Sequence, residues 1–321
     1  MGSPTPLKVS DSGLAPEHYT IGWIGLLFKE QTAAIMMLDK KNPDIEMQSN
    51  HPNAYSLGSI GPHNVVIACL PPGWGGHNTI ATIAVWMTST FPSIRRCLLV
   101  GIGGGIPARV RLGDVVVGVP DGEFPGVVAW REDGEIAGIN HPPSILLSTL
   151  TKLKSIHEIE GSNVPKYLDE FKKHHRLASI YLVSEELKDP LFEKNEDKTT
   201  AEGDTTTSTS TTREAEIYYG LVASTSLPIK DITSRENLDS RLGSRRLLCI
   251  DTVASELLTD FPCIVIRGIC EYAGESHDAY KGWGGPAAAT AAAFAKEVLC
   301  MLPKSQVIHL PTIKSMGASV F

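Results

Sequence analysis

The most constraining feature of the sequence is an alternation of short apolar runs with helical segments, which begins near Tyr19 and continues to about residue 302. The runs YTIGWIGLL, RRCLLVGIGG, GDVVVGVP, IYYGLVAS and PCIVIRGIC have the length and β-rich content of buried strands. Segments such as KEQTAAIMMLDK, HNTIATIAVWMTSTF and GPAAATAAAFAKEVLCML have helical composition. This alternation predicts an α/β chain with three layers, in which a mixed, mostly parallel central sheet is flanked by helices.

The two ends of the chain and one internal segment depart from this pattern. Residues 1–17 are rich in Pro, Ser and Gly and predict a flexible N-terminal tail, whereas residues 18–303 predict one domain and residues 304–321 a C-terminal tail. Residues 193–213 are polar and of low complexity, so we expect a disordered surface insertion rather than a linker between domains. Within the domain, AYSLGSIG and HNVVIACL predict a hairpin that turns at Gly61-Pro62.

Composition and charge exclude several classes of function. The chain has 29 Lys and Arg against 36 Asp and Glu, a formal net charge of −7, so a nucleic-acid partner is not expected. No apolar run reaches the ~18 residues of a membrane span, and the N-terminus has no apolar signal region, so we expect a cytoplasmic protein without membrane contact. The six cysteines show no CxxC spacing and mostly lie in apolar runs, which favours free thiols, no metal and no cofactor.

The candidate site residues are those that directly follow the predicted strands, because ligands of open parallel sheets bind beyond the carboxyl ends of the strands. Glu30 follows the first strand, Asp251 follows LLCI and Glu271 follows IVIRGIC. Taken alone, Glu30 is typical of a solvated first helical turn, and Glu271 is equally a structural cap or a proton donor. Asp251 is a charge in a buried-looking segment, which needs a partner or a task.

A glycine run, GIGGG, follows the strand that contains LLV. It lacks the last glycine of GxGxxG and the Lys-Ser/Thr of a phosphate-binding loop, so it does not predict a nucleotide site. Two interpretations stay open. The backbone of Ile102, Gly103 and Gly104 either lies against a flat ligand or forms a tight turn that needs positive φ.

Read in order, several of these motifs carry a family resemblance. The segments IGWIGLLFKEQTAA, HNVVIACLPPG, FPSIRRCLLVGIGGGIP, RLGDVVVGVP, GLVAS, FPCIVIRGICEYA and AAATAAAFAKEVL resemble the nucleoside phosphorylase/nucleosidase superfamily from about residue 19 to 302. They are most similar to the purine-nucleoside-type domain of many fungal proteins, which often precedes NACHT or ankyrin regions. Neither pattern follows here, so we expect a stand-alone domain. The resemblance also implies a homodimer or higher homo-oligomer.

The resemblance implies cleavage of an N-glycosidic bond through an oxocarbenium-like sugar. Glu30 falls on the glutamate that activates water in nucleosidases, and Glu271 falls on the aspartate that protonates the leaving base. The first loop, LLFKEQ, lacks the Gly-Asp-Pro and arginine pattern that binds phosphate in phosphorylases, and the glycine run offers neither Arg nor Ser. These features favour a hydrolase, although Lys29, Arg95 and Arg96 are available cations.

Three ligand-facing positions depart from the family pattern. The ribose-binding Glu-Met-Glu-Ala-Ala reads DTVAS here (residues 251–255), so Val253 replaces the glutamate that holds the ribose hydroxyls, with Asp251 and Thr252 before it. Glu271 adds a methylene to the family aspartate. The segment beside the base, which contains Ser224, has lost its glycine, and Trp283 either covers the ligand or packs in the core.

Two functions therefore stay open. The first is a purine-nucleosidase-like hydrolase of altered specificity, with Glu30 and Glu271 as catalytic residues. The second is a fold repurposed to bind or transform (cyclise or rearrange) an apolar secondary metabolite. Val253 discriminates between them, because a pocket without its ribose clamp favours a ligand that lacks vicinal hydroxyls. The expected partner in both cases is a small molecule.

Overall fold

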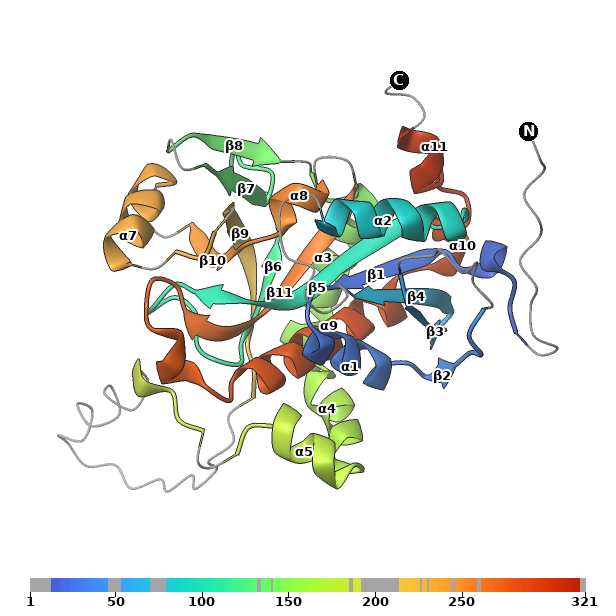
Figure 1. Cartoon of the computed structure of the whole chain (residues 1–321), viewed down its shortest axis with the longest axis horizontal. Coiled ribbons are helices and arrows are strands. Elements are labelled where there is room, and N and C mark those ends of the chain that lie inside the picture. The colour runs from blue at the N-terminus through green and yellow to red at the C-terminus, as the bar shows by residue number, and fades with distance from the viewer. Residues whose placement is uncertain are drawn as a thin grey trace.

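A single sheet with helices on both faces forms the body of the protein (Figure 1). The computed structural model describes residues 13–45, 53–69, 79–131, 134–139, 141–184, 187–191, 214–225, 227–229, 231–243, 246–258 and 261–317. The strands are β1 (Ile21–Gly25), β2 (Lys40–Lys41), β3 (Tyr55–Ile60), β4 (His63–Cys69), β5 (Arg96–Gly105), β6 (Val115–Gly118), β7 (Val127–Trp130), β8 (Ile136–Ile139), β9 (Ile217–Thr225), β10 (Leu247–Asp251) and β11 (Cys263–Tyr272).

The helices occupy both sides of this sheet. They are η1 (Pro16–His18), α1 (Phe28–Met36), α2 (Thr79–Thr90), α3 (Ser144–Glu160), α4 (Val164–Lys172), α5 (His175–Tyr181), α7 (Ile232–Arg241), α8 (Ala254–Leu258), η2 (His277–Tyr280), α9 (Gly284–Met301), α10 (Lys304–Val307) and α11 (Ile313–Gly317). Helices α1, α4 and α9 lie on one face and α2 and α8 on the other, which Figure 1 shows below and above the sheet. This arrangement confirms the predicted three-layer α/β architecture.

The sheet has the strand order β2-β3-β4-β1-β5-β11-β6-β9-β7-β8. Its central pairings β4–β1, β1–β5 and β5–β11 are parallel, as are β6–β9 and β9–β7. Strand β10 pairs with both β5 and β9, so β5, β11, β6, β9 and β10 close into a ring of five strands. The ring brings the carboxyl ends of β5, β10 and β11 close to one another.

The predicted hairpin is confirmed. Strands β3 and β4 pair in antiparallel register from Tyr55 opposite Ala68 to Ile60 opposite His63. Gly61 has a φ of +50°, a left-handed conformation that glycine adopts without strain. The pattern did not predict the hairpin of β7 and β8, because these strands have only four residues each.

Helix α9 is the central helix of its layer, and its composition explains how closely it packs. Its buried residues include seven alanines, and it contacts β5, β11 and α1. A Cβ atom on Gly268 of β11 would lie 1.9 Å from the carbonyl oxygen of Ala287, so only glycine allows this approach. Small residues on both sides therefore determine the distance between α9 and the sheet.

The ends of the domain differ in part from the expectation. Residues 304–317, predicted as part of a tail, contain α10 and α11. Val307 and Ile313 are buried, and the Ile313 N–H donates to the carbonyl oxygen of Ile94. These contacts hold the segment against the domain, because Val307 and Ile313 pack into its hydrophobic core. The predicted insertion 193–213 lies outside the described residues, as do residues 1–12 of the predicted N-terminal tail.

Candidate active site

Glu30 lies in the first turn of α1, just beyond the carboxyl end of β1, and is buried rather than solvated. Its Oε2 atom accepts hydrogen bonds from the backbone N–H groups of Leu26 (2.5 Å) and Leu27 (2.9 Å), and its Oε1 atom accepts one from Ile102 (2.8 Å). The residue is 5% exposed. Burial raises the pKa of Glu30, while the charge of Arg267 and the three backbone donors oppose this shift. The solvated alternative is therefore wrong.

Arg267, in the middle of β11, is the partner of two carboxylates. It is 1% exposed, and its Nε and Nη2 atoms lie 2.9 and 2.6 Å from Oδ2 of Asp251. Burial lowers the pKa of Arg267, but the charges of Asp251 and Glu30 outweigh it, so the net shift is upward. Glu30, Arg267 and Asp251 thus form a buried group of charges, which we call the carboxylate–arginine triad.

Asp251 uses both of its oxygen atoms within the protein. Oδ1 accepts hydrogen bonds from the N–H groups of Val253 (3.2 Å) and Ala254 (3.1 Å), at the start of α8, and Oδ2 binds Arg267. Its side chain is 1% exposed. Arg267 is therefore the partner that the buried charge of Asp251 requires. Because both oxygen atoms of Asp251 are already bonded within the protein, we do not expect Asp251 to contact a ligand directly.

The glycine run is part of β5 and not a turn. Its glycines have no positive φ, so the tight-turn interpretation is wrong. The reason for glycine is space: a Cβ on Gly101 would lie 2.3 Å from Oε1 of Glu30 and 2.6 Å from Nη1 of Arg267, and one on Gly103 would lie 2.6 Å from Sγ of Cys249. Gly103 and Gly104 are buried and Ile102 is half-buried. The run makes room for the triad, and the Ile102 N–H is already bonded to Glu30.

Glu271 lies next to the last residue of β11, opposite Gly104 of β5. Its side chain is 30% exposed, and its Oε2 atom pairs with Nδ1 of His277 in η2. The His277 side chain is 78% exposed. Sequence reasoning missed His277, since a lone histidine in a polar loop carries no signal of its own. The structure joins the two groups into a carboxylate–imidazole pair.

The remaining predicted residues divide into packed and accessible ones. The Ser224 hydroxyl is buried; it accepts a hydrogen bond from the Ser255 N–H (2.9 Å) and donates to the Ser255 hydroxyl (3.2 Å), so it ties β9 to α8. Trp283 is 5% exposed and donates its indole N–H to the Lys188 carbonyl oxygen, which favours its packing role. Thr252 and Val253 are half-buried, directly after β10.

Comparison with solved structures identifies the fold. The 5′-methylthioadenosine/S-adenosylhomocysteine nucleosidase of Neisseria meningitidis, in complex with methylthio-immucillin-A, aligns with a TM-score of 0.55 and 14% identity over 88% of this chain and 99% of that chain. The chain has the phosphorylase/nucleosidase fold. A putative nucleosidase of the same type from Borrelia burgdorferi B31, bound to adenine, aligns with a TM-score of 0.56 and 13% identity over 87% of this chain and 99% of that one. The futalosine hydrolase of Helicobacter pylori strain 26695 aligns with a TM-score of 0.52 and 15% identity over 88% of this chain and 97% of that chain. At these identities the likeness shows the fold alone.

Among curated proteins, a nucleotide-binding leucine-rich repeat (NLR)-like protein of Hyaloscypha variabilis (strain UAMH 11265 / GT02V1 / F) is 38% identical over 317 residues. The match covers 94% of this chain but 31% of that protein, so the chain spans about a third of its relative's length. No protein-family model matches the chain.

The described residues contain neither a candidate metal site nor a candidate membrane-spanning helix. No group of three His, Cys, Asp or Glu side chains within them is placed to hold a metal ion. Their helices are also too short or too polar to cross a membrane.

Proposed function

We propose that the chain is a purine-nucleosidase-like hydrolase, which cleaves an N-glycosidic bond by attack of water on an oxocarbenium-like sugar. The observation that supports this proposal is the position of Glu30, held by three backbone N–H groups and beside Arg267, at the carboxyl ends of β1 and β5. Ligands of open α/β sheets bind at this edge. A fixed carboxylate whose pKa is raised by burial is suited to accept a proton near neutral pH.

The proposed reaction assigns one task to each charged group. Glu30 accepts a proton from the attacking water while the oxygen atom of that water bonds to the anomeric carbon. The electron pair of the breaking C–N bond goes to the purine, which takes up a proton from the Glu271–His277 pair. Arg267 does not touch the substrate in this scheme. It positions Glu30 and keeps its ionised form accessible.

Hydrolysis is favoured over phosphorolysis by the location of the nearby arginines. Arg96 is the first residue of β5, at the amino end of the strand, whereas the Ile102 N–H meets Glu30 towards the other end. The Arg95 guanidinium donates to the carbonyl oxygen of Leu310, beside α11. Neither arginine lies at the carboxyl edge, so neither is placed to hold a phosphate beside Glu30.

The second candidate function, a pocket repurposed for an apolar metabolite, is supported by one specific observation. Val253 stands where the resemblance expects the ribose-binding glutamate, and Asp251 is fully used by Arg267 and the start of α8. Asp251, the carboxylate nearest to Val253 in the sequence, therefore does not compensate for the lost ribose contact. A ligand without vicinal hydroxyls would lose nothing from this change.

The deciding experiment incubates the purified protein with purine nucleosides, including 5′-methylthioadenosine and 2′-deoxyadenosine, with and without phosphate. Free base is measured by liquid chromatography and mass spectrometry. Base released without phosphate supports the hydrolase, base released only with phosphate overturns the role of water, and no base under either condition favours the second candidate.

Glu30→Gln tests the proposed role of Glu30. We expect base release to fall by at least ~100-fold, the usual contribution of a general base. Because all three partners of Glu30 are N–H donors, the new amide N–H₂ must face a donor, so folding is checked by circular dichroism at the assay temperature. The matched control is Glu160→Gln, an exposed change of the same type on α3. Equal activity of both variants would remove Glu30 from the mechanism.

We also propose, from the resemblance, that the chain assembles into a homodimer or a higher homo-oligomer. Light scattering coupled to size-exclusion chromatography measures the mass directly, and a monomer at assay concentration would refute this.

A further inference from the structure

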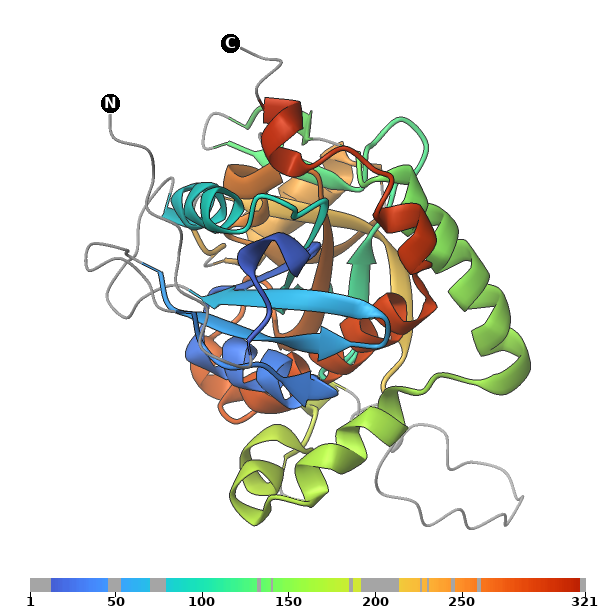
Figure 2. The same cartoon turned by 90° about the vertical axis from the view of Figure 1, so that its right-hand side faces the viewer.

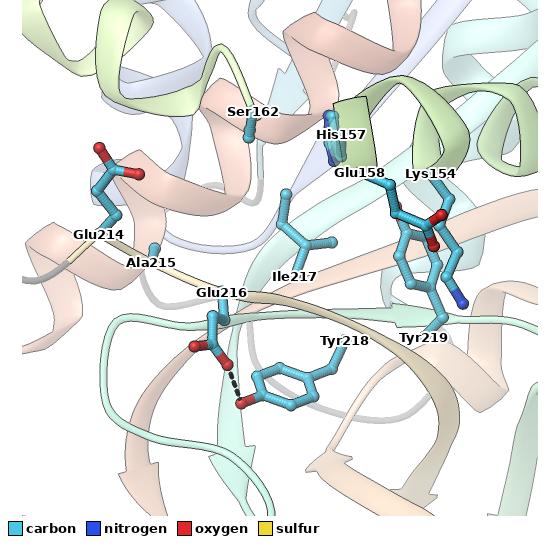
Figure 3. A pocket seen from close by; sticks show the side chains of 10 residues that line it. All are labelled: Lys154, His157, Glu158, Ser162, Glu214, Ala215, Glu216, Ile217, Tyr218 and Tyr219. Carbon is cyan, nitrogen blue, oxygen red and sulfur yellow. Dashed lines mark hydrogen bonds between the residues drawn. The ribbon is translucent and has the colours of Figure 1, made fainter. Parts of the chain in front are cut away.

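A pocket lies between α3 and the start of β9, and none of the triad residues lines it (Figure 3). Its volume is about 630 Å³, within the usual range for sites that bind small molecules. Its walls are formed by α3, by the connection after α3 and by the segment that enters β9. The residues that line it are Lys154, His157, Glu158, Ser162, Glu214, Ala215, Glu216, Ile217, Tyr218 and Tyr219.

This pocket is separate from the candidate active site. Tyr219 lies near the amino end of β9 and Ser224 near its carboxyl end. Five residues of extended strand span roughly 17 Å. The pocket is therefore remote from Ser224, and none of its lining residues belongs to the triad or to the Glu271–His277 pair, so the inference does not depend on the proposed nucleosidase function.

The charge of the pocket favours a cation. Three glutamates line it, against one lysine. Glu216 is partly neutralised, because its Oε1 atom lies 2.9 Å from Nη2 of Arg111 and its Oε2 atom accepts a hydrogen bond from the Tyr218 hydroxyl (2.5 Å). Glu158 and Glu214 are exposed, and neither has a hydrogen-bond or ion-pair partner among the described residues. In Figure 3, Glu158 and Glu214 lie towards opposite ends of the pocket.

The ring of Tyr219 already binds an ammonium group. The Nζ atom of Lys154 lies over the ring, 5.7 Å from its centroid, at the same end of the pocket as Glu158. An ammonium over an aromatic face is attracted by the electron density of the ring. Because Lys154 is an exposed, flexible side chain, an amine from solution can replace it at this position.

The Tyr219 hydroxyl is a second, independent sign of a missing partner. It is buried and has no hydrogen-bond partner among the described residues, although buried polar groups are nearly always paired. Burial and the charge of Glu297 raise the pKa of Tyr219, so the hydroxyl stays protonated.

We propose that this pocket binds a small organic polycation, such as an aliphatic polyamine, with one amine over Tyr219 in place of the Lys154 ammonium and another near Glu214. The apolar chain between the amines would lie along Ile217 and the tyrosine rings. A ligand with an ammonium at each end can pair with both exposed carboxylates, which lie towards opposite ends of the pocket, whereas a single inorganic cation would pair with one of them.

The test measures the binding of spermidine by isothermal titration calorimetry, with α,ω-octanediol as an uncharged control of similar length. We expect saturable binding of spermidine below about 1 mM and none of the diol. Glu158→Gln should weaken binding about two- to fivefold, the range for one exposed ion pair, whereas Glu160→Gln, on the same helix but outside the pocket, should not change it.

A second substitution should change the affinity for spermidine in the opposite direction. Lys154→Met removes the competing ammonium from the Tyr219 ring and should tighten spermidine binding about three- to tenfold. The control Lys152→Met removes the same charge from an exposed position of α3 that does not line the pocket. Equal effects of the two lysine variants would mean that spermidine is attracted to the acidic surface in general. That result, or the absence of saturable binding, overturns the proposal.

Discussion

Replacing Arg267 by methionine gives the sharpest test of the carboxylate–arginine triad. The guanidinium makes two hydrogen bonds to Oδ2 of Asp251, at 2.9 and 2.6 Å, and both side chains are 1% exposed. Removing one member of a buried ion pair leaves an uncompensated charge, which typically lowers the free energy of unfolding by about 3–5 kcal/mol. Here two carboxylates, Asp251 and Glu30, lose the same partner, so we expect the upper part of this range.

The assay is urea unfolding followed by tryptophan fluorescence, at pH values from 5 to 8. Arg267 opposes the burial that raises the pKa of Glu30, so that pKa rises further in Arg267→Met. A carboxyl whose folded pKa is raised stabilises the fold below its unfolded pKa and loses this contribution as the pH rises through the folded value. The difference in the free energy of unfolding between the wild type and Arg267→Met should therefore become smaller as the pH falls from 8 towards 5.

The double variant Arg267→Met/Asp251→Asn separates charge from packing. Asparagine keeps an oxygen for the N–H groups of Val253 and Ala254 but carries no charge. We expect the double variant to be more stable than Arg267→Met alone, although it contains one more substitution. The control Arg131→Met breaks an exposed pair with Glu135 and should change stability by less than ~1 kcal/mol. If the effects of the two triad substitutions on the free energy of unfolding are additive, the buried-charge argument is refuted.

Three further changes test other parts of the structure. Gly268→Ala places a Cβ 1.9 Å from the Ala287 carbonyl oxygen and should lower the free energy of unfolding by about 2–4 kcal/mol in urea; a neutral effect would show that α9 shifts freely. Burial raises the pKa of Asp114 to about 6, so the wild type should lose up to ~3 kcal/mol relative to Asp114→Asn between pH 4 and 7, and parallel stability profiles would contradict this. Val253→Glu should strengthen ribonucleoside binding in calorimetry by about tenfold, since a carboxylate can accept from both ribose hydroxyls; tight binding by the native protein with no change in the variant would refute this.

Much of the fold follows from local sequence signals. Strands β1, β5 and β11 are buried almost throughout, as are the last six residues of β9, and the apolar runs of these strands distinguish them from polar segments. Helix α9 is predicted because its alanine-rich composition favours a helix and Gly285-Pro286 suits its first turn. The short strands β7 and β8 carry no comparable signal, since four residues do not establish a period.

The candidate site is predictable only in part, because its contacts depend on tertiary structure. The sequence shows that Asp251 needs a partner, but Arg267 is 16 residues away in an apolar run, and the two meet only because β10 joins β5 beside β11. An arginine inside such a run is itself a signal, since buried arginines are rare unless paired. The glycine run is interpreted correctly only when Glu30 and Arg267 are seen to fill the space that side chains would occupy.

The triad also limits which ligand the candidate site can select. In a pocket that binds ribose through a carboxylate, loss of that residue is tolerable when a neighbouring acid can turn towards the ligand. Asp251 is the nearest acid in sequence to Val253, but turning it outward would break four hydrogen bonds and leave Arg267 buried with Glu30 alone. A buried arginine that loses one of two partners is strongly destabilising. Selectivity must therefore come from elsewhere in the site. The Glu271–His277 pair offers a half-buried carboxylate and an exposed imidazole, so under the proposed function recognition should depend more on the base-like end of a ligand than on its sugar-like end.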